Sequence, residues 1–140
     1  MSNQRNVLCL KIPILTHNNK LMNKERPYIC MTNLPNLRLL KGQSARIVHY
    51  NNPSAPPINR MIIYPGSNVP FVSPTVIDCD KVFEVLNVSF IDPALLMRTP
   101  ERPSSISVEA FDNVQRKLKL ADFVICNLPL AETSSASVCK

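Results

Sequence analysis

The chain has 140 residues, close to the commonest length of a single domain, and 45% of them are apolar, which is enough for one hydrophobic core. It holds only two glycines against thirteen prolines. The glycine-rich loops with which nucleotide-binding folds approach phosphate are therefore excluded. Five widely spaced cysteines lack any CxxC pair, which argues against a structural zinc site and favours reduced, mostly buried thiols.

The net charge of +6 is unevenly distributed along the chain. Residues 1–60 carry nine basic groups and one acidic group, whereas residues 61–140 carry seven basic and nine acidic groups. A positive surface contributed by the N-terminal half would attract nucleic-acid phosphates or anionic lipid headgroups. The alternative is that these charges are scattered, solvated positions that only keep the protein soluble.

Alternating apolar residues predict a strand over Val7–Leu15, where Pro13 implies an edge position or a bulge. A polar loop should follow over Thr16–Arg26. Gly42 is expected to end a short strand, and the proline-rich segment Asn51–Asn59 should be an exposed loop. We expect further strands over residues 28–32, 37–40, 45–50 and 61–64.

The segment Val69–Ile77 contains two prolines and is expected to be irregular or at a sheet edge. Asp78, Cys79 and Asp80 could ligate a hard cation, but an acidic turn is the better interpretation. Val82–Ile91 has the pattern of a central strand, with Leu86, Val88 and Phe90 on one face.

Near the C-terminus, apolar residues at steps of three and four predict an amphipathic helix over Val108–Ala121. Ser107 is a plausible N-cap, and Glu109 in the first turn suits the helix dipole. A last strand is expected over residues 123–128, and a frayed tail over 131–140. The predicted fold is a β-rich α+β single domain over residues 1–130, with a sandwich- or barrel-like sheet and one C-terminal amphipathic helix.

No catalytic constellation is visible in the sequence. Acid–base or nucleophilic catalysis needs a base beside a nucleophile. The two histidines, His17 and His49, have neither an acid nor a cysteine beside them in sequence. We therefore expect a binding protein rather than an enzyme, with no cofactor and no metal.

The expected binding surface for a membrane or a nucleic acid consists of basic residues of the N-terminal half. They are Lys11, Lys20, Lys24, Arg26, Arg38, Lys41 and Arg46. Tyr28 and Tyr50 are the only aromatics near them that could stack on bases, so sequence-selective single-strand binding is not favoured.

Pro53-Ser54-Ala55-Pro56 resembles the Pro-Ser/Thr-Ala-Pro late domain of viral matrix and Gag proteins. Closely spaced prolines favour an extended conformation that a groove can capture with little loss of entropy. The resemblance implies recruitment of the ESCRT-I sorting complex during budding. It points to the small matrix proteins of enveloped negative-strand RNA viruses.

That resemblance also implies self-association, contact with RNA or nucleocapsid, and a peripheral position at the inner membrane face in the host cytoplasm and the virion. The sequence shows no signal peptide and no apolar stretch near the roughly 20 residues of a membrane span. Two alternatives remain open: an RNA- or DNA-binding accessory protein, and a regulator that binds a host factor.

Overall fold

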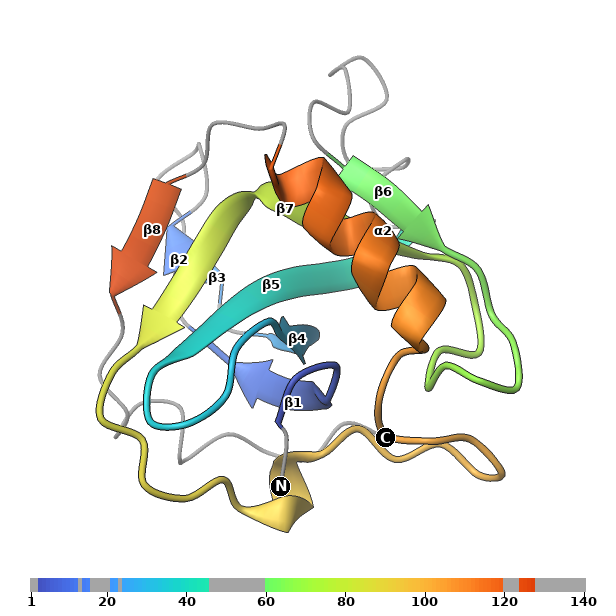
Figure 1. The fold of residues 1–140 in the computed structure, drawn as a ribbon, viewed down its shortest axis with the longest axis horizontal. Coiled ribbons are helices and arrows are strands. Elements are labelled where there is room, and N and C mark those ends of the chain that lie inside the picture. The colour runs from blue at the N-terminus through green and yellow to red at the C-terminus, as the bar shows by residue number, and fades with distance from the viewer. Residues whose placement is uncertain are drawn as a thin grey trace.

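The computed structural model describes residues 3–12, 14–15, 21–22, 24–45, 60–119 and 124–127 (Figure 1). The elements are the strands β1 (Val7–Lys11), β2 (Ile14–Leu15), β3 (Leu21–Met22), β4 (Glu25–Cys30), β5 (Leu37–Ser44), β6 (Arg60–Ile63), β7 (Thr75–Val85) and β8 (Val124–Asn127), the 3-10 turn η1 (Pro93–Leu95) and the helix α2 (Val108–Lys119). The prediction of a β-rich α+β fold with a helix near the C-terminus is confirmed.

A six-stranded sheet forms the body of the molecule, with its strands in the order β1-β4-β5-β7-β6. These five strands pair in antiparallel fashion, whereas β8 pairs in parallel with β7. The outer edge of β7 is shared, because β6 pairs with residues 75–78 and β8 pairs with residues 81–84. In Figure 1, β8 and β6 accordingly lie toward opposite ends of β7.

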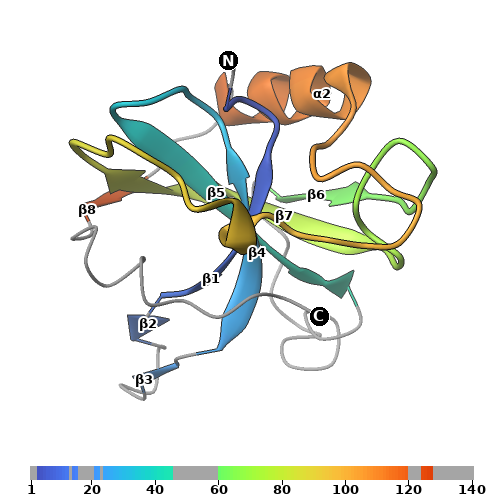
Figure 2. The same ribbon diagram turned by 90° about the horizontal axis from the view of Figure 1, so that it is seen from below.

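The antiparallel pairing of β1 with β4 continues beyond the six-stranded sheet as the pair of β2 with β3. Val7 pairs with Ile29 and Lys11 with Glu25, and the same register continues in the pair of Ile14 with Met22. The prediction of a strand over Val7–Leu15 is thus confirmed in two pieces, while Pro13 lies outside the described residues. The predicted loop over Thr16–Arg26 is wrong for β3 and for the first residues of β4. Figure 2 shows β2 and β3 extending beyond the other strands.

Gly42 does not end a strand, contrary to the prediction, because β5 continues to Ser44. The register between β5 and β7 shifts at this point: Leu40 faces Val82, whereas Gly42 faces Ile77. A Cβ atom at Gly42 would lie 3.1 Å from the side chains of both Ile77 and Thr75. Glycine is therefore favoured here by close packing inside the sheet. The strand expected over 45–50 lies outside the described residues except for Ala45, which follows β5.

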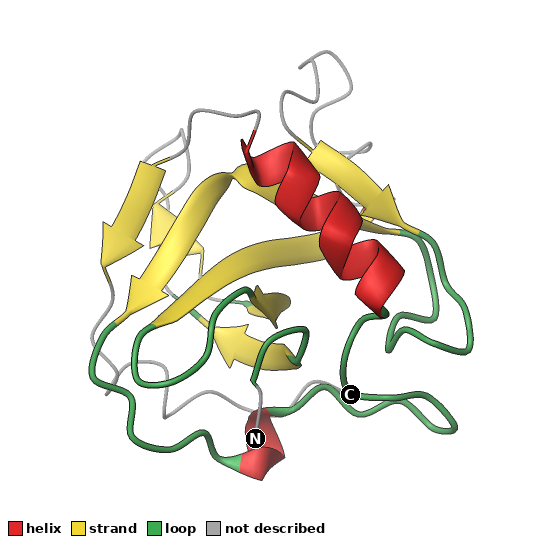
Figure 3. Cartoon of the chain, viewed as in Figure 1, coloured by secondary structure: helices red, strands yellow, loops and turns green. Residues whose placement is uncertain are grey.

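Each face of the sheet carries its own apolar cluster. On the helix face, Phe111 and Val114 of α2 pack against sheet residues that include Val7, Leu40 and Ile77. On the opposite face, named here the cavity face, the cluster includes Leu8, Tyr28, Leu39 and Phe83. Figure 3 shows α2 lying across the sheet, with long loops running along its ends.

The position of α2 was predicted correctly from local sequence features. The helix begins at Val108, and the Ser107 hydroxyl accepts a hydrogen bond from the Ala110 amide at 3.1 Å, which confirms the predicted N-cap. The strand expected over 123–128 is confirmed as β8. The tail at 131–140 lies outside the described residues.

Two predictions around β7 are wrong. Asp78–Asp80 belongs to this long strand rather than to a turn, and the strand ends at Val85 instead of continuing to Ile91. Beyond that point Val88 is buried, as its pattern indicated, but Leu86 and Phe90 are exposed. Cys9 is disulfide-bonded, so the expectation of reduced thiols is wrong for it, whereas Cys30 is a free, buried thiol.

Candidate anion-binding site

The seven cations expected to form a binding surface do not share one face. Lys20 and Arg46 lie outside the described residues, as does the late-domain-like segment Pro53–Pro56. Lys11 and Lys24 are exposed at the outer end of the β1–β4 hairpin, where Glu25 is the cross-strand neighbour of Lys11. An acid directly opposite a base offsets part of its charge.

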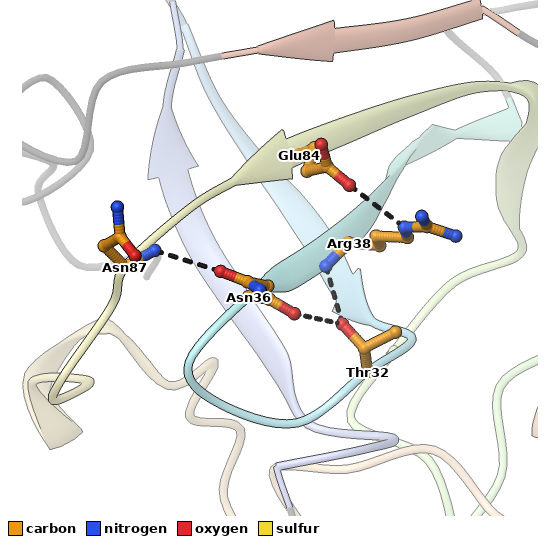
Figure 4. A network of polar contacts seen from close by, with 5 residues as sticks. All are labelled: Thr32, Asn36, Arg38, Glu84 and Asn87. Carbon is orange, nitrogen blue, oxygen red and sulfur yellow. Dashed lines mark hydrogen bonds and ion pairs between the residues drawn. The ribbon is translucent and has the colours of Figure 1, made fainter.

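Arg38 has a structural role on the other face of the sheet. Its Nε atom lies 3.1 Å from Glu84 Oε2, and its backbone amide donates to the Thr32 hydroxyl at 2.8 Å. That hydroxyl donates to the Asn36 carbonyl, and the Asn36 side chain accepts from the Asn87 amide, as Figure 4 shows. The network fixes the turn between β4 and β5. Because the charge of Arg38 is paired with Glu84 on the helix face, Arg38 does not contribute to a cationic site on the cavity face.

The two remaining cations, Arg26 and Lys41, meet others on the cavity face. We name this group the cationic cluster: Arg26 of β4, Lys41 of β5, Arg60 of β6 and Lys81 of β7. Lys41 is within electrostatic reach of the other three and of Asp78, and Asp78 pairs with Lys41 and Arg60. The strand register creates the cluster. Tyr28 faces Lys41 across β4 and β5, Arg60 faces Asp78 across β6 and β7, and the irregularity between β5 and β7 lies beside Lys41.

Asp78 is the described carboxylate of the cluster. Arg60 Nε lies 2.9 Å from Asp78 Oδ1, but the N–H does not point at this oxygen, so the contact is an ion pair without a hydrogen bond. Lys41 Nζ lies 3.7 Å from Asp78 Oδ2, which is too far for a good hydrogen bond. The side chains of Lys41, Asp78 and Arg60 are 12%, 14% and 24% exposed. The charges are therefore recessed from the surface and only loosely paired.

Besides the acceptor Asp78 Oδ1, two buried donors of the cluster have no hydrogen-bond partner among the described residues. They are Arg26 Nε and the hydroxyl of Tyr28, a residue that is fully buried and packs edge-on against Phe83. Arg26 Nη1 reaches only the backbone carbonyl of Glu25, at 3.2 Å. Buried polar groups nearly always have a hydrogen-bond partner in native proteins, and a role in binding an ion is one reason for an exception.

The electrostatics of Lys41 are determined first by burial and then by its charged neighbours. Burial lowers the pKa of Lys41; Asp78 opposes this shift, while Lys81, Arg26 and Arg60 add to it. Burial also raises the pKa of Tyr28, so its hydroxyl stays protonated as a donor. An incoming anion would satisfy the unpaired donors and relieve the repulsion among the cations.

An apolar cavity of about 240 Å³ opens on the same face of the sheet. Leu8 and Leu10 of β1 and Leu37 and Leu39 of β5 line it, together with side chains from the end of β7 and from the segment up to Leu95. Asp92 is the single charged residue in its lining, and its Oδ1 atom caps η1 by accepting from the Ala94 amide at 2.9 Å.

Sequence reasoning identified Arg26 and Lys41 but missed Arg60, Lys81 and Asp78 as their partners. Only the pairing of β4 through β7 brings these residues together, and no spacing in the sequence encodes it. Among the described residues no group of three or more His, Cys, Asp and Glu side chains could hold a metal. Both histidines lie outside those residues, so the absence of catalysis stays a prediction.

The described part of the chain contains no helix with the length and hydrophobicity needed to span a bilayer. No protein-family model matches the chain, and comparison with curated proteins finds no relative.

Proposed function

We propose that this chain is a non-enzymatic, matrix-type structural protein that binds the anionic face of a membrane through its cationic cluster. One observation carries the proposal: in the described part of the chain, Arg26 Nε is buried without a hydrogen-bond partner, in a group of four cations that has Asp78 as its carboxylate. A phosphate or carboxylate of a lipid headgroup supplies the acceptor oxygens that these donors lack.

The recessed position of the cluster determines how a headgroup would be bound. Because Lys41 and Arg60 are mostly covered, the headgroup has to reach between the surrounding side chains of the cavity face instead of lying across a flat surface. Each basic residue near an anionic membrane contributes about 1 kcal/mol, an effect that salt screens. Removing one cluster cation should therefore weaken binding about fivefold.

Nucleic acid is the competing partner, since its phosphates have the same chemistry. Base stacking would need exposed aromatic rings at the cluster. Tyr28 is fully buried against Phe83, and Tyr50 lies outside the described residues. Tyr64 and Phe90 are exposed, but neither is a member of the cluster. The aromatic ring within the cluster is thus covered, which favours the membrane over nucleic acid as the partner.

Budding is the second part of the proposal and rests on the resemblance of Pro53–Pro56 to a late domain. In this account the segment recruits the ubiquitin-variant domain of ESCRT-I, and the chain self-associates at the membrane, where it also contacts RNA or nucleocapsid. A pull-down with that domain tests the recruitment: the wild-type chain should retain it, and Pro56→Leu should not. Equal retention by both would contradict it.

Vesicle co-sedimentation tests the membrane-binding part. The chain should pellet with phosphatidylcholine vesicles that contain phosphatidylserine and remain soluble with phosphatidylcholine alone, and added salt should reduce the binding. Arg26→Gln should weaken binding about fivefold. Arg38→Gln removes the same charge from the other face of the sheet and should leave binding nearly unchanged.

Binding that ignores phosphatidylserine and salt would contradict the proposal, as would equal losses in the two variants. A parallel titration with single-stranded RNA completes the design. RNA binding that depends on Arg26, without any vesicle binding, would replace the membrane with nucleic acid.

A further inference from the structure

The apolar cavity and the cationic cluster lie side by side on the cavity face. Leu10 lines the cavity and is the direct cross-strand neighbour of Arg26. Leu8 lines it too and faces Tyr28, which in turn faces Lys41 on its other side. Side chains opposite each other in an antiparallel pair have Cβ atoms only about 5 Å apart. The β1 side chains that line the cavity are therefore direct neighbours of Arg26 and Tyr28.

The cavity itself has the size and lining for a short hydrocarbon group. Its walls are aliphatic side chains of the sheet, most of them almost fully buried, and Phe90 stands at its rim with 68% of its surface exposed. A smaller cavity of about 150 Å³ with similar walls admits benzene. At about 240 Å³ this one has room for a longer apolar group, such as part of an acyl chain.

The charges determine which end group such a ligand would have. Arg26 lies beside Leu10, and Tyr28 lies beside Leu8. Neither Arg26 Nε nor the Tyr28 hydroxyl has a hydrogen-bond partner within the residues that the structure describes. Arg26 Nε can only donate a hydrogen bond, and the protonated hydroxyl of Tyr28 can donate one as well as accept one. The carboxylate of Asp92, in contrast, already caps η1. An acceptor-rich, negatively charged head next to an apolar chain matches this arrangement.

We propose that the cavity and the cationic cluster form one two-part site for a single-chain anionic amphiphile, of the class of fatty-acid anions and lysophospholipids. The chain occupies the cavity, and the carboxylate or phosphate accepts hydrogen bonds from Arg26 and Tyr28 close to Lys41. This deepens the proposed function, since it uses the same cluster, but it concerns a monomeric ligand in solution.

Isothermal titration calorimetry with decanoate below its micelle concentration tests the site. Decyltrimethylammonium has the same chain with a cationic head, and acetate has the anionic head without the chain. Decanoate should bind at least about tenfold more tightly than either, because a hydrogen bond to a charged group and a buried chain each contribute that much. Equal binding of decanoate and decyltrimethylammonium would overturn the proposal, and so would no binding of decanoate.

Matched variants assign the two parts of the site. Arg26→Gln should weaken decanoate about tenfold and leave decyltrimethylammonium unchanged, whereas Arg38→Gln should alter neither. Leu95→Phe narrows the cavity and should weaken both chain-bearing ligands, while Leu86→Phe, at an exposed leucine outside the lining, should not. Asp92→Asn removes the negative charge from the cavity lining and should strengthen the binding of decanoate. If Leu95→Phe and Leu86→Phe weakened the binding of the chain-bearing ligands equally, the assignment of the cavity would be overturned.

The outcome is separable from that of the vesicle experiment. Charge-dependent vesicle binding without decanoate binding would refute the amphiphile site alone. Decanoate binding without vesicle binding would refute the membrane function and leave the amphiphile site standing.

Discussion

Replacement of Lys41 by methionine should stabilise the fold while weakening anion binding. Lys41 is 12% exposed, and Asp78 is its ion-pair partner at 3.7 Å. Burial nevertheless lowers its pKa below the ordinary 10.5, which means that the attraction of Asp78 does not offset the loss of hydration and the repulsion of the neighbouring cations. A residue that destabilises the fold in this way is typical of a binding site.

The size of the effect follows from the competing contributions. At an effective dielectric constant of about 20, charges 3.7 Å apart attract by about 4 kcal/mol. The lowered pKa shows that desolvation and repulsion together exceed this attraction. Methionine keeps a similar volume and buries apolar atoms instead, and Asp78 retains Arg60 at 2.9 Å. Replacing a whole buried ion pair by apolar groups often stabilises by about 1–4 kcal/mol, whereas removing one partner destabilises when the other charge is left uncompensated. Because Asp78 keeps its contact with Arg60, we expect Lys41→Met to stabilise the fold by about 1 kcal/mol.

Urea denaturation as a function of pH is the assay. Below the lowered pKa of Lys41 the wild type carries the full cost of the buried charge. That cost disappears as the pH rises toward 10.5, because the unfolded chain then loses the same proton. The advantage of Lys41→Met should therefore be greatest near neutral pH and vanish at alkaline pH. A variant less stable than the wild type near neutral pH, or an advantage that grows with pH, would refute the reasoning.

Three further predictions concern the fold. Ser107→Ala removes the N-cap of α2 and should lower the free energy of unfolding by about 1 kcal/mol in urea denaturation, with Ser105→Ala as the control. Gly42→Ala places a Cβ 3.1 Å from Ile77 and should cost about 1 kcal/mol or more; an unchanged unfolding midpoint would contradict the packing argument. Burial raises the pKa of Cys30 from 9.0 to about 12, so the unfolded chain loses this proton first and stability falls as the pH rises through that range. In Cys30→Ala the fall measured by urea titration should be smaller, and an identical fall would contradict it.

The parts of the fold set by local patterns were predictable from the sequence. The apolar spacing of α2, its cap at Ser107 and the alternation in Val7–Leu15 are interactions between near neighbours in the chain. Gly42 and Asp78 were misread for the opposite reason. Glycine beside polar residues, and an Asp-Cys-Asp triplet, are both typical of turns. Here they lie within long strands, where packing against Ile77 and pairing with Lys41 and Arg60 decide the conformation.

The candidate site was only half predictable for a related reason. Residue type indicated that Arg26, Lys41 and Arg38 are cations. Only the register of the strands shows that Lys41 lies opposite Tyr28 and beside Asp78, and that Arg26 lies opposite Leu10 on the same face. Arg38 is bound to Glu84 on the other side of the sheet. The cavity beside them depends on the chain after Val85 leaving the sheet, and the alternating pattern over Val82–Ile91 predicted the opposite.

The most direct test of the central claim is to observe the Nε–H groups of Arg26 and Arg38 by NMR while bicelles containing phosphatidylserine are added. Arg26 Nε has no hydrogen-bond partner in the described ranges of the chain, so its resonance should shift and its exchange with water should slow as a headgroup accepts the hydrogen bond. Arg38 Nε, already 3.1 Å from Glu84, should not change. An Arg26 signal that stays fixed at saturating bicelles, or that moves no more than that of Arg38, would contradict the account.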